Sequence, residues 1–280
     1  MYRVPIELIS MALEEDGAWN DITTLSTVPA EEQAEARIIA RREGVIAGLM
    51  VAAEVFRTLD PDVHVELLLP EGSHVAPDTV IAHISGPACS ILSAERVALN
   101  FLGHLSGIAT LTSYCVRALE GTHARILDTR KTTPGLRALE KAAIQLGGGK
   151  NHRFGLNDGV LIKDNHIKAA GGVAQAVLSA RAKAPHLLKI EVECETLAEV
   201  REALEAQADV ILLDNMHIEQ MREAVAHIRA ANTRVLIEAS GNIGTDLTRI
   251  AAVAATGVDF ISSGALTHSA PNFDVSLEFA

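Results

Sequence analysis

Residues 188–215 read LKIEVECETLAEVREALEAQADVILLDN, and this stretch decides the fold class. It contains a β-rich run at 188–192, a segment with a helical pattern and a second apolar run at 209–213. A strand, a helix and a further strand in this order are typical of a βα unit in a parallel sheet. Each of the two runs leads directly into acidic side chains, Glu193 and Asp214.

The same unit repeats on both sides of this stretch. Six β-rich runs occur in all, at 125–128, 159–163, 188–192, 209–213, 234–238 and 258–262. The segments between them have helical patterns. In one of them Thr133 and Pro134 form a cap and first turn, apolar residues follow at helical spacing, and Gly147 stops the pattern. We therefore expect an α/β fold with a parallel sheet.

Two folds fit such a repeat, a βα barrel and a doubly wound open sheet. An open sheet concentrates its functional residues at one switch point, whereas a barrel gathers them from the carboxyl ends of many strands. Here every run ends in polar residues, from 128–131 (DTRK) to Ser263 and Gly264. The sequence therefore predicts a barrel. The periodicity predicts six strands, and it gives no signal for a seventh or an eighth.

The first 90 residues follow a different pattern, with predicted strands at 36–40, 63–69 and 80–84 and helices near 4–15 and 49–59. We expect an α+β sandwich domain over residues 1–106 and the barrel over 107–269. The last residues, 273–279, alternate like a strand. This C-terminal segment, 270–280, is expected to pack on the first domain.

Composition excludes several classes of protein. The 280 residues are 48% hydrophobic and carry a formal net charge of −12, so a basic surface for nucleic acid or an anionic membrane is not expected. The three cysteines, Cys89, Cys115 and Cys194, are far apart and suggest neither a disulfide framework nor a zinc site. No leader pattern or apolar run of membrane length is present. A cytoplasmic protein is expected.

The charge is unevenly distributed along the chain. Residues 121–170 carry nine Lys and Arg against four Asp and Glu, whereas the stretches on either side are acidic. Five cations of this basic segment lie at or beside two predicted strand ends: Arg130, Lys131, Lys150, Arg153 and Lys163. Neighbouring cations repel one another unless an anion lies between them. The segment therefore predicts a site for a small, multiply charged anionic ligand.

Carboxylates and small residues follow the later strands. Glu193 and Asp214 end adjacent strands and could hold Mg²⁺ together with substrate phosphates. We expect only one of Glu191 and Glu193 to face the barrel interior. Ser240, Gly241 and Asn242, and then Ser263 and Gly264, follow the last two strands, where barrels commonly bind phosphate. We interpret His104, His166 and His268 as ordinary polar residues and the cysteines as buried apolar side chains.

Long motifs in the chain resemble a known family. These are DTRKTTPGLRALEK, GGGKNHRFGLNDGVLIKDNH, IEVEC followed by LLDN, EASGN and TGVDFISSGALTHS, with EEDGAWNDITT, RREGVIAGL and ERVALNFLGHLSGIATLT before them. Together they are similar to quinolinate phosphoribosyltransferase, also called nicotinate-nucleotide pyrophosphorylase (carboxylating), over nearly the whole chain. The resemblance implies a barrel of seven strands that is incompletely closed, preceded by an open sandwich domain.

The resemblance also implies an activity and an assembly. The activity is Mg²⁺-dependent transfer of phosphoribose from phosphoribosyl pyrophosphate to quinolinate, with loss of CO₂, giving nicotinate mononucleotide and pyrophosphate in de novo NAD synthesis. The assembly is a homodimer in which each subunit completes the site of the other. Its motifs place quinolinate binding on Arg96, Thr129, Arg130, His152, Arg153 and Lys163, with Arg96 reaching into the partner's site. They imply catalytic roles for Lys131, Lys163, Glu193 and Asp214, with Lys131 near both substrates and the two acids near the ribose and metal. Phosphate binding falls on Lys131, Ser240, Gly241 and Gly264.

Asn242 is a departure, because many members of the family have a second glycine there. Two other functions stay open. A relative of the family acts as an accessory protein in molybdate uptake with similar barrel motifs, although the full GGGKNHR and KDNH motifs favour quinolinate. Lys131 or Lys163 could also form a Schiff base in an aldolase-type barrel, which requires a lysine with a lowered pKa. A binding module without catalysis would not need both the cations and the carboxylates.

Overall fold

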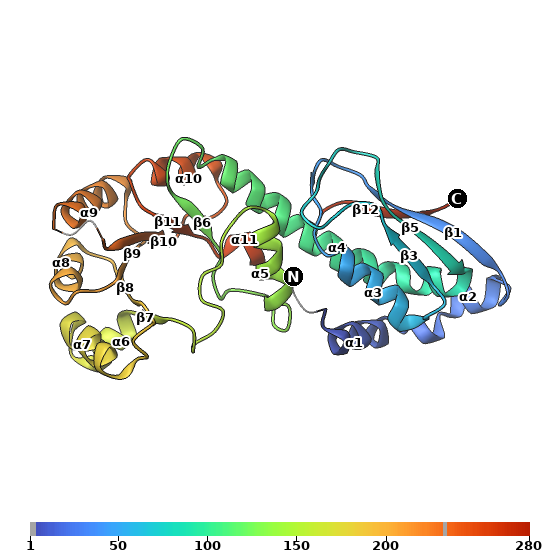
Figure 1. Ribbon diagram of the computed structural model, residues 1–280, viewed down its shortest axis with the longest axis horizontal. Coiled ribbons are helices and arrows are strands. Elements are labelled where there is room, and N and C mark those ends of the chain that lie inside the picture. The colour runs from blue at the N-terminus through green and yellow to red at the C-terminus, as the bar shows by residue number, and fades with distance from the viewer. Residues whose placement is uncertain (1–3, 232–233) are drawn as a thin grey trace. The chain divides into compact units, whose positions relative to one another are not determined.

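A computed structural model describes residues 4–231 and 234–280, and Figure 1 shows it as a ribbon. The chain divides into two compact units. The first comprises Met1–Ser113, Thr133–Gly148 and Ala270–Ala280, and the second comprises Tyr114–Thr132 and Gly149–Ser269. This division falls within the long helix α4 (Ala88–Arg117). It also groups α5 (Arg137–Leu146), which was predicted to lie within the barrel, with the first unit.

The second unit contains a parallel sheet of six strands, as the repeat predicted. They are β6 (Arg125–Leu127), β7 (Val160–Ile162), β8 (Ile190–Cys194), β9 (Val210–Asp214), β10 (Leu236–Ser240) and β11 (Phe260–Ser262). Their spatial order is β6-β11-β10-β9-β8-β7, so the first strand pairs with the last. A doubly wound sheet would reverse its order at a switch point. The unit is therefore an α/β barrel that is left open between β6 and β7.

The position of the seventh strand that the resemblance implied is taken by a single β-bridge among the described residues. Leu127 of β6 pairs in parallel with Lys150, outside any named strand. Lys150 N–H donates to Ile126 O at 3.0 Å, and its carbonyl accepts from Asp128 N–H at 3.2 Å. This bridge attaches the segment before His152 to the edge of the barrel, beside the strand end that carries Arg130.

Helices follow the barrel strands: α6 (Asp164–Ala170), α7 (Val173–Lys183), α8 (Leu197–Glu205), α9 (Ile218–Ala231), α10 (Leu247–Ala254) and α11 (Ala265–His268). Figure 1 shows α8, α9 and α10 along the outer side of the sheet. Helix α8 begins with a capping box at Thr196. The Thr196 side chain accepts a hydrogen bond from Glu199 N–H, and the Glu199 carboxylate accepts one from Thr196 N–H. The strands are mostly apolar. In β9, for example, every residue is buried except the last, Asp214. Because helices cover the sheet, the strands are mostly apolar and the polar side chains gather at their ends and in the loops that follow.

The first unit is an α+β domain. Its elements are α1 (Ile6–Asp16), the 3₁₀ turn η1 (Ala18–Asn20), α2 (Ile22–Thr27), β1 (Gln33–Ala40), β2 (Gly44–Val45), α3 (Leu49–Leu59), β3 (His64–Leu67), β4 (His74–Val75), β5 (Thr79–Pro87), α4, α5 and β12 (Val275–Phe279). The antiparallel sheet has the order β12-β1-β5-β3. The C-terminal strand β12 pairs with β1 from Ala36 opposite Phe279 to Ala40 opposite Val275. Residues far apart in the chain thereby share one sheet, as the sequence predicted for this C-terminal segment.

Two of the three cysteines are buried as the sequence predicted. Cys115 and Cys194 have no exposed surface, whereas Cys89 is only partly buried, and all three are free. Burial raises the pKa of the Cys115 thiol to about 11. Among the helices of the described residues, none is long and apolar enough to cross a membrane.

Candidate functional site

A cavity of about 690 Å³ lies at the carboxyl ends of the barrel strands. Its lining contains eleven of the twelve residues that sequence motifs selected: Thr129, Arg130, Lys131, His152, Arg153, Lys163, Glu193, Asp214, Ser240, Gly241 and Gly264. The twelfth, Arg96, is an exposed residue of α4 in the first unit. Lys150 is exposed and does not line the cavity. Parallel strands bring these side chains together because all their carboxyl ends meet at one rim.

Two arginines form the basic wall of the cavity. Burial, and then the nearby charge of Arg130, lowers the pKa of Arg153, while Glu191 and Asp158 act in the opposite direction. The Arg153 guanidinium donates to Gly159 O at 2.9 Å, which fixes its direction. Two partly buried guanidinium groups this close repel each other, and a bound carboxylate relieves that repulsion through paired hydrogen bonds. This wall suits an anionic ligand.

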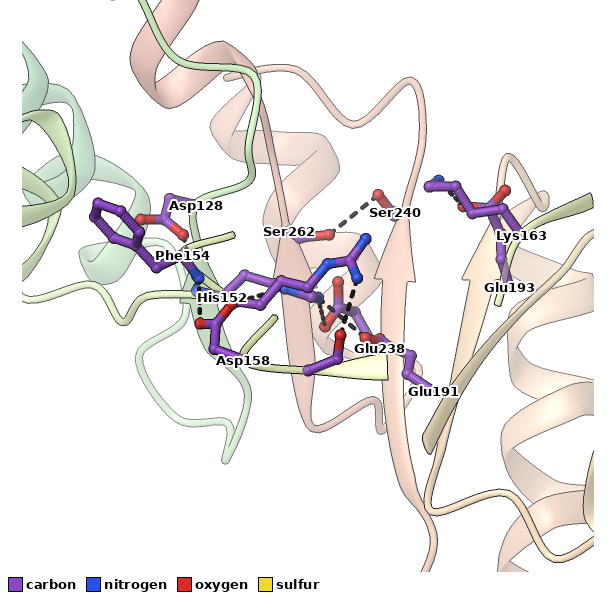
Figure 2. Close-up of polar contacts among 12 residues, drawn as sticks. Asp128, His152, Phe154, Asp158, Lys163, Glu191, Glu193, Glu238, Ser240 and Ser262 are labelled. Atoms are coloured by element: carbon purple, nitrogen blue, oxygen red, sulfur yellow. Dashed lines mark hydrogen bonds and ion pairs between the residues drawn. The ribbon is translucent and has the colours of Figure 1, made fainter. Parts of the chain in front are cut away.

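The carboxylates lie on the adjacent strands β8 and β9. Glu193 forms an ion pair with Lys163 at the end of β7, and Figure 2 shows this pair on one side of the view. Burial, and then the charge of Glu193, raises the pKa of Asp214, whose carboxylate also accepts from the Asn215 side chain at 2.6 Å. One lysine, Lys163, neutralises only one of the two neighbouring carboxylates, so the group can still bind a cation. Their oxygen atoms are ligands of the kind that Mg²⁺ prefers.

The loop after β10 approaches these acids closely. Gly241 has φ +78°, and a Cβ atom there would lie 2.7 Å from Asp214 Oδ1. Asn242, where many relatives of the resembled family carry glycine, has φ +46°. Asparagine tolerates this left-handed conformation better than most residues do. Asn242 thus provides the turn that the second glycine would provide.

The loop after β11 accommodates Lys131. A Cβ atom at Gly264 would lie 2.8 Å from the Cδ atom of Lys131, so the glycine leaves space for the lysine side chain. Thr267 Oγ1 donates to Lys131 O at 2.8 Å and holds the lysine backbone against the same loop. His268, which we interpreted as an ordinary polar residue, also lines the cavity. The first and last strands of the barrel therefore jointly place Lys131.

A cluster of two buried glutamates and the partly buried His152, which lies beneath the basic wall, was not predicted. His152 Nε2 lies 3.1 Å from Glu191 Oε2 and 3.7 Å from Glu238 Oε2. Figure 2 shows the three side chains converging. Glu191 is 7% exposed and Glu238 is 2% exposed. Burial, and then the charge of Glu191, raises the pKa of Glu238 to about 8.

The expectation that only one of Glu191 and Glu193 faces inward is wrong. Side chains two positions apart on a strand point to the same face, and both glutamates are directed into the barrel. Glu193 lies near the carboxyl end and Glu191 lies one layer deeper. The signal that could have identified Glu238 is its place inside the apolar run 234–238, where a charged residue needs a partner.

Comparison with known proteins assigns the chain. The family model described as the C-terminal domain of quinolinate phosphoribosyl transferase matches residues 108–278, and the model of its N-terminal domain matches residues 21–106. This chain belongs to the quinolinate phosphoribosyltransferase family. As a member of that family it is an enzyme, a pentosyltransferase that acts in NAD biosynthesis. This assignment excludes the interpretation of the protein as a Schiff-base aldolase.

Similar proteins cover both units. A probable nicotinate-nucleotide pyrophosphorylase [carboxylating] from Synechocystis sp. is 49% identical over 89% of this chain and 83% of its own length. One from Bacillus subtilis is 45% identical over 97% of this chain and 92% of its own length. The crystal structure of NadC from Streptococcus pyogenes superimposes with a TM-score of 0.90 at 42% identity, covering 98% of this chain and 96% of that one. The α/β barrel and the antiparallel sheet domain therefore follow the fold of this family.

Proposed function

We propose that the cavity of the second unit transfers phosphoribose from phosphoribosyl pyrophosphate to quinolinate and then releases CO₂, giving nicotinate mononucleotide and pyrophosphate. One observation carries this proposal. The basic wall, the carboxylate pair and both small-residue loops line a single cavity. The names of the relatives, which describe nicotinate-nucleotide pyrophosphorylases, support the same reaction.

Quinolinate is a dianion, and the basic wall supplies its counter-charge. Arg130 and Arg153 can each bind a carboxylate through two parallel N–H groups, while Lys163 acts as a point charge at the next strand end. Thr129 lines the same wall, and its Oγ1 accepts from Lys131 N–H at 3.0 Å. Binding both carboxylates fixes the ring, so its nitrogen can face the ribose.

Phosphoribosyl pyrophosphate occupies the opposite part of the cavity in this proposal. Ser240, Gly241 and Gly264 offer hydroxyl and backbone N–H groups to phosphate oxygens, and Lys131 lies beside them. The bond from ribose C1 to the pyrophosphate oxygen breaks with its electron pair, and the ring nitrogen forms the new bond to C1. Glu193 and Asp214 stabilise the positive charge that develops on the ribose.

Glu193 and Asp214 would also hold Mg²⁺, because a pair of carboxylates together with substrate phosphates is a common magnesium environment. The ion supplies charge neutralisation for the departing pyrophosphate. Lys163, paired with Glu193, keeps that carboxylate near Asp214 before the ion binds.

The decarboxylation follows from the charge that the transfer creates. Once the ring nitrogen carries the ribose it is cationic, and the bond from C2 to its carboxylate breaks with its electron pair left on C2. CO₂ leaves, and C2 then takes one proton. Arg130 and Arg153 hold the ring during this step by its remaining carboxylate.

We propose a homodimer in which Arg96 completes the site of the partner subunit. Arg96 is exposed on α4, and it is absent from the lining of the cavity that holds the other eleven residues selected by the motifs. A further guanidinium delivered from a second copy would add to the positive charge facing quinolinate.

The test is turnover of quinolinate and phosphoribosyl pyrophosphate with and without Mg²⁺. Quinolinate labelled in its 2-carboxylate should release labelled CO₂ in step with nicotinate mononucleotide, and removal of Mg²⁺ should suppress both products. Binding of quinolinate without any turnover would contradict the proposal, and would instead support a binding module without catalysis.

A further inference from the structure

The buried cluster separates two cavities of the barrel. A second cavity of about 510 Å³ lies at the amino ends of the strands, where its lining includes Val160, Val210 and Phe260. His152, Arg153 and Glu238 line both this lower cavity and the substrate cavity. A single layer of side chains therefore separates the two cavities. It consists of His152, Arg153 and Glu238, with Glu191 beside them.

His152 is held from several directions. Its backbone N–H donates to the buried Asp128 Oδ1 at 2.8 Å, and its Nδ1 accepts from Arg153 N–H at 2.7 Å. A lone pair at Nδ1 leaves the single ring proton on Nε2, which faces Glu191 at 3.1 Å. Both ring nitrogens thus contact other parts of the protein. A direct hydrogen bond from the ring to quinolinate would require one of these contacts to break.

The contacts of His152 also determine the position of Arg153. Its N–H is bound to the His152 ring, and its guanidinium donates to Gly159 O. Glu191 also supplies a negative charge that offsets the repulsion between Arg153 and Arg130. The position of the Arg153 side chain in the basic wall therefore depends on a ring that Glu191 holds in place.

We propose that Glu191 is a positioning residue for quinolinate recognition, which it serves by anchoring His152 and, through it, Arg153, and that Glu238 supports it from below. His152 then acts through Arg153 and does not itself contact the substrate. This inference rests on the proposed function and adds two residues to its machinery.

The cost of burying two glutamates supports a role of this kind. Burying a carboxylate without full compensation destabilises the folded state. Oε1 of Glu191 and Oε1 of Glu238 are both buried and have no hydrogen-bond partner among the described residues. An apolar pair would fill the barrel at lower cost, but only a carboxylate accepts from His152 Nε2 and also offsets the charge of Arg153.

The experiment compares Glu191→Leu with Glu191→Gln in the full-length protein. Glutamine still offers an oxygen to His152 Nε2–H, whereas leucine does not. Loss of a partner that orients a metal ligand typically costs about tenfold to a hundredfold, and we take the same range for the partner that orients His152. We expect Glu191→Leu to raise the quinolinate KM, and the Kd measured by calorimetry, by such a factor while the KM for phosphoribosyl pyrophosphate stays unchanged. Glu191→Gln should recover most of the loss.

A double-mutant cycle shows whether the effect passes through Arg153. Arg153→Lys keeps the charge but loses the planar guanidinium, so it should weaken quinolinate binding by itself. If Glu191 and His152 act through Arg153, adding Glu191→Leu or His152→Ala to Arg153→Lys should cost little more than Arg153→Lys alone. His152→Ala provides a second measurement if Glu191→Leu does not fold, as judged by circular dichroism.

Two results would overturn the inference alone. One is an unchanged quinolinate Kd in folded Glu191→Leu, and the other is a double variant that loses the sum of the single effects, as expected if His152 contacts quinolinate itself. An unaltered protein that bound no quinolinate would instead overturn the proposed function, and this inference with it.

Discussion

A Cβ atom at Gly241 would lie only 2.4 Å from Oδ1 of Asn215, so the loop after β10 fits against the end of β9 only as glycine. Asn215 itself has φ +55° and donates to Asp214. The loop that we propose to bind phosphate is therefore in contact with Asn215 and Asp214 at one corner of the cavity, and a change in one displaces the other.

Gly241→Ala should accordingly disturb both substrate binding and stability. The added methyl group meets Asn215 and Asp214, and φ +78° is unfavourable for alanine by about 1–2 kcal/mol. We expect a higher KM for phosphoribosyl pyrophosphate and a lower melting temperature. Gly121→Ala is the matched control, because Gly121 has φ +81° and an added methyl group there would meet nothing within 4 Å. Equal effects of the two substitutions on KM would contradict the role assigned to the contact.

Arg130→Ala or Arg153→Ala should abolish measurable quinolinate binding while the fold stays intact. Removing one member of a buried, charge-assisted contact typically costs about 2–5 kcal/mol, or roughly 30-fold to several thousandfold in affinity. Calorimetry with quinolinate measures the loss. Arg222→Ala is the control, because Arg222 is exposed on α9 and pairs with Glu219 at 3.6 Å, away from the cavity lining. Undiminished affinity in the Arg130 or Arg153 variant would exclude that residue from the quinolinate site.

The raised pKa of Glu238 predicts how the free energy of unfolding depends on pH. Its pKa in the folded protein is raised to about 8 from an ordinary value of 4.5, so between these values the folded state keeps a proton that the unfolded chain has lost. The contribution of this group to the free energy of unfolding therefore falls as pH rises from 4.5 to about 8, by at most about 1.4 kcal/mol per pH unit. Above that range the contribution is constant.

Glu238→Gln removes this dependence, because glutamine stays neutral. Urea unfolding at several pH values between about 5 and 9 should show the variant gaining on the unaltered protein as pH rises. Parallel stability curves for the two proteins would mean that Glu238 is already ionised in the folded state.

Mixing two inactive proteins tests the shared site. Arg96→Ala and Lys163→Ala subunits should each be inactive as homodimers, since every site lacks one of the two residues. A heterodimer of the two would contain one intact site, because one subunit supplies Lys163 and the other supplies Arg96. Activity should reach up to half that of the unaltered dimer in a doubly tagged, purified heterodimer. Heterodimers without activity would show that Arg96 does not act across subunits.

Much of this protein can be predicted from local sequence. The runs at 125–128 and 209–213 became strands because they are rich in apolar residues and are followed by helical patterns, and Gly147 ends a helix as its position in the sequence predicted. Strand direction then gathered Arg130, Lys163 and Glu193 at one rim. Such residues are predictable because they depend on chain order and strand polarity alone.

The deeper layer of the site could not be predicted in this way. Glu191, Glu238 and His152 come from different parts of the chain, and their pairing depends on which interior side chains meet across the barrel. Our expectation for Glu191 failed for a simpler reason, since residues two apart on a strand share a face. The fit of Asn242 into a left-handed turn also became visible only once the loop geometry was known.

The sequence by itself determined the α/β repeat, the family and the eleven cavity residues at the strand ends, because these depend on periodicity, motif order and strand polarity. Only the tertiary structure decided that the barrel is open between β6 and β7, that Gly241 must touch Asn215, and that His152 is bound to the protein at both ring nitrogens. The physical reason is distance. Hydrogen bonds and charge pairing act over a few ångströms, and only folding sets which groups come that close.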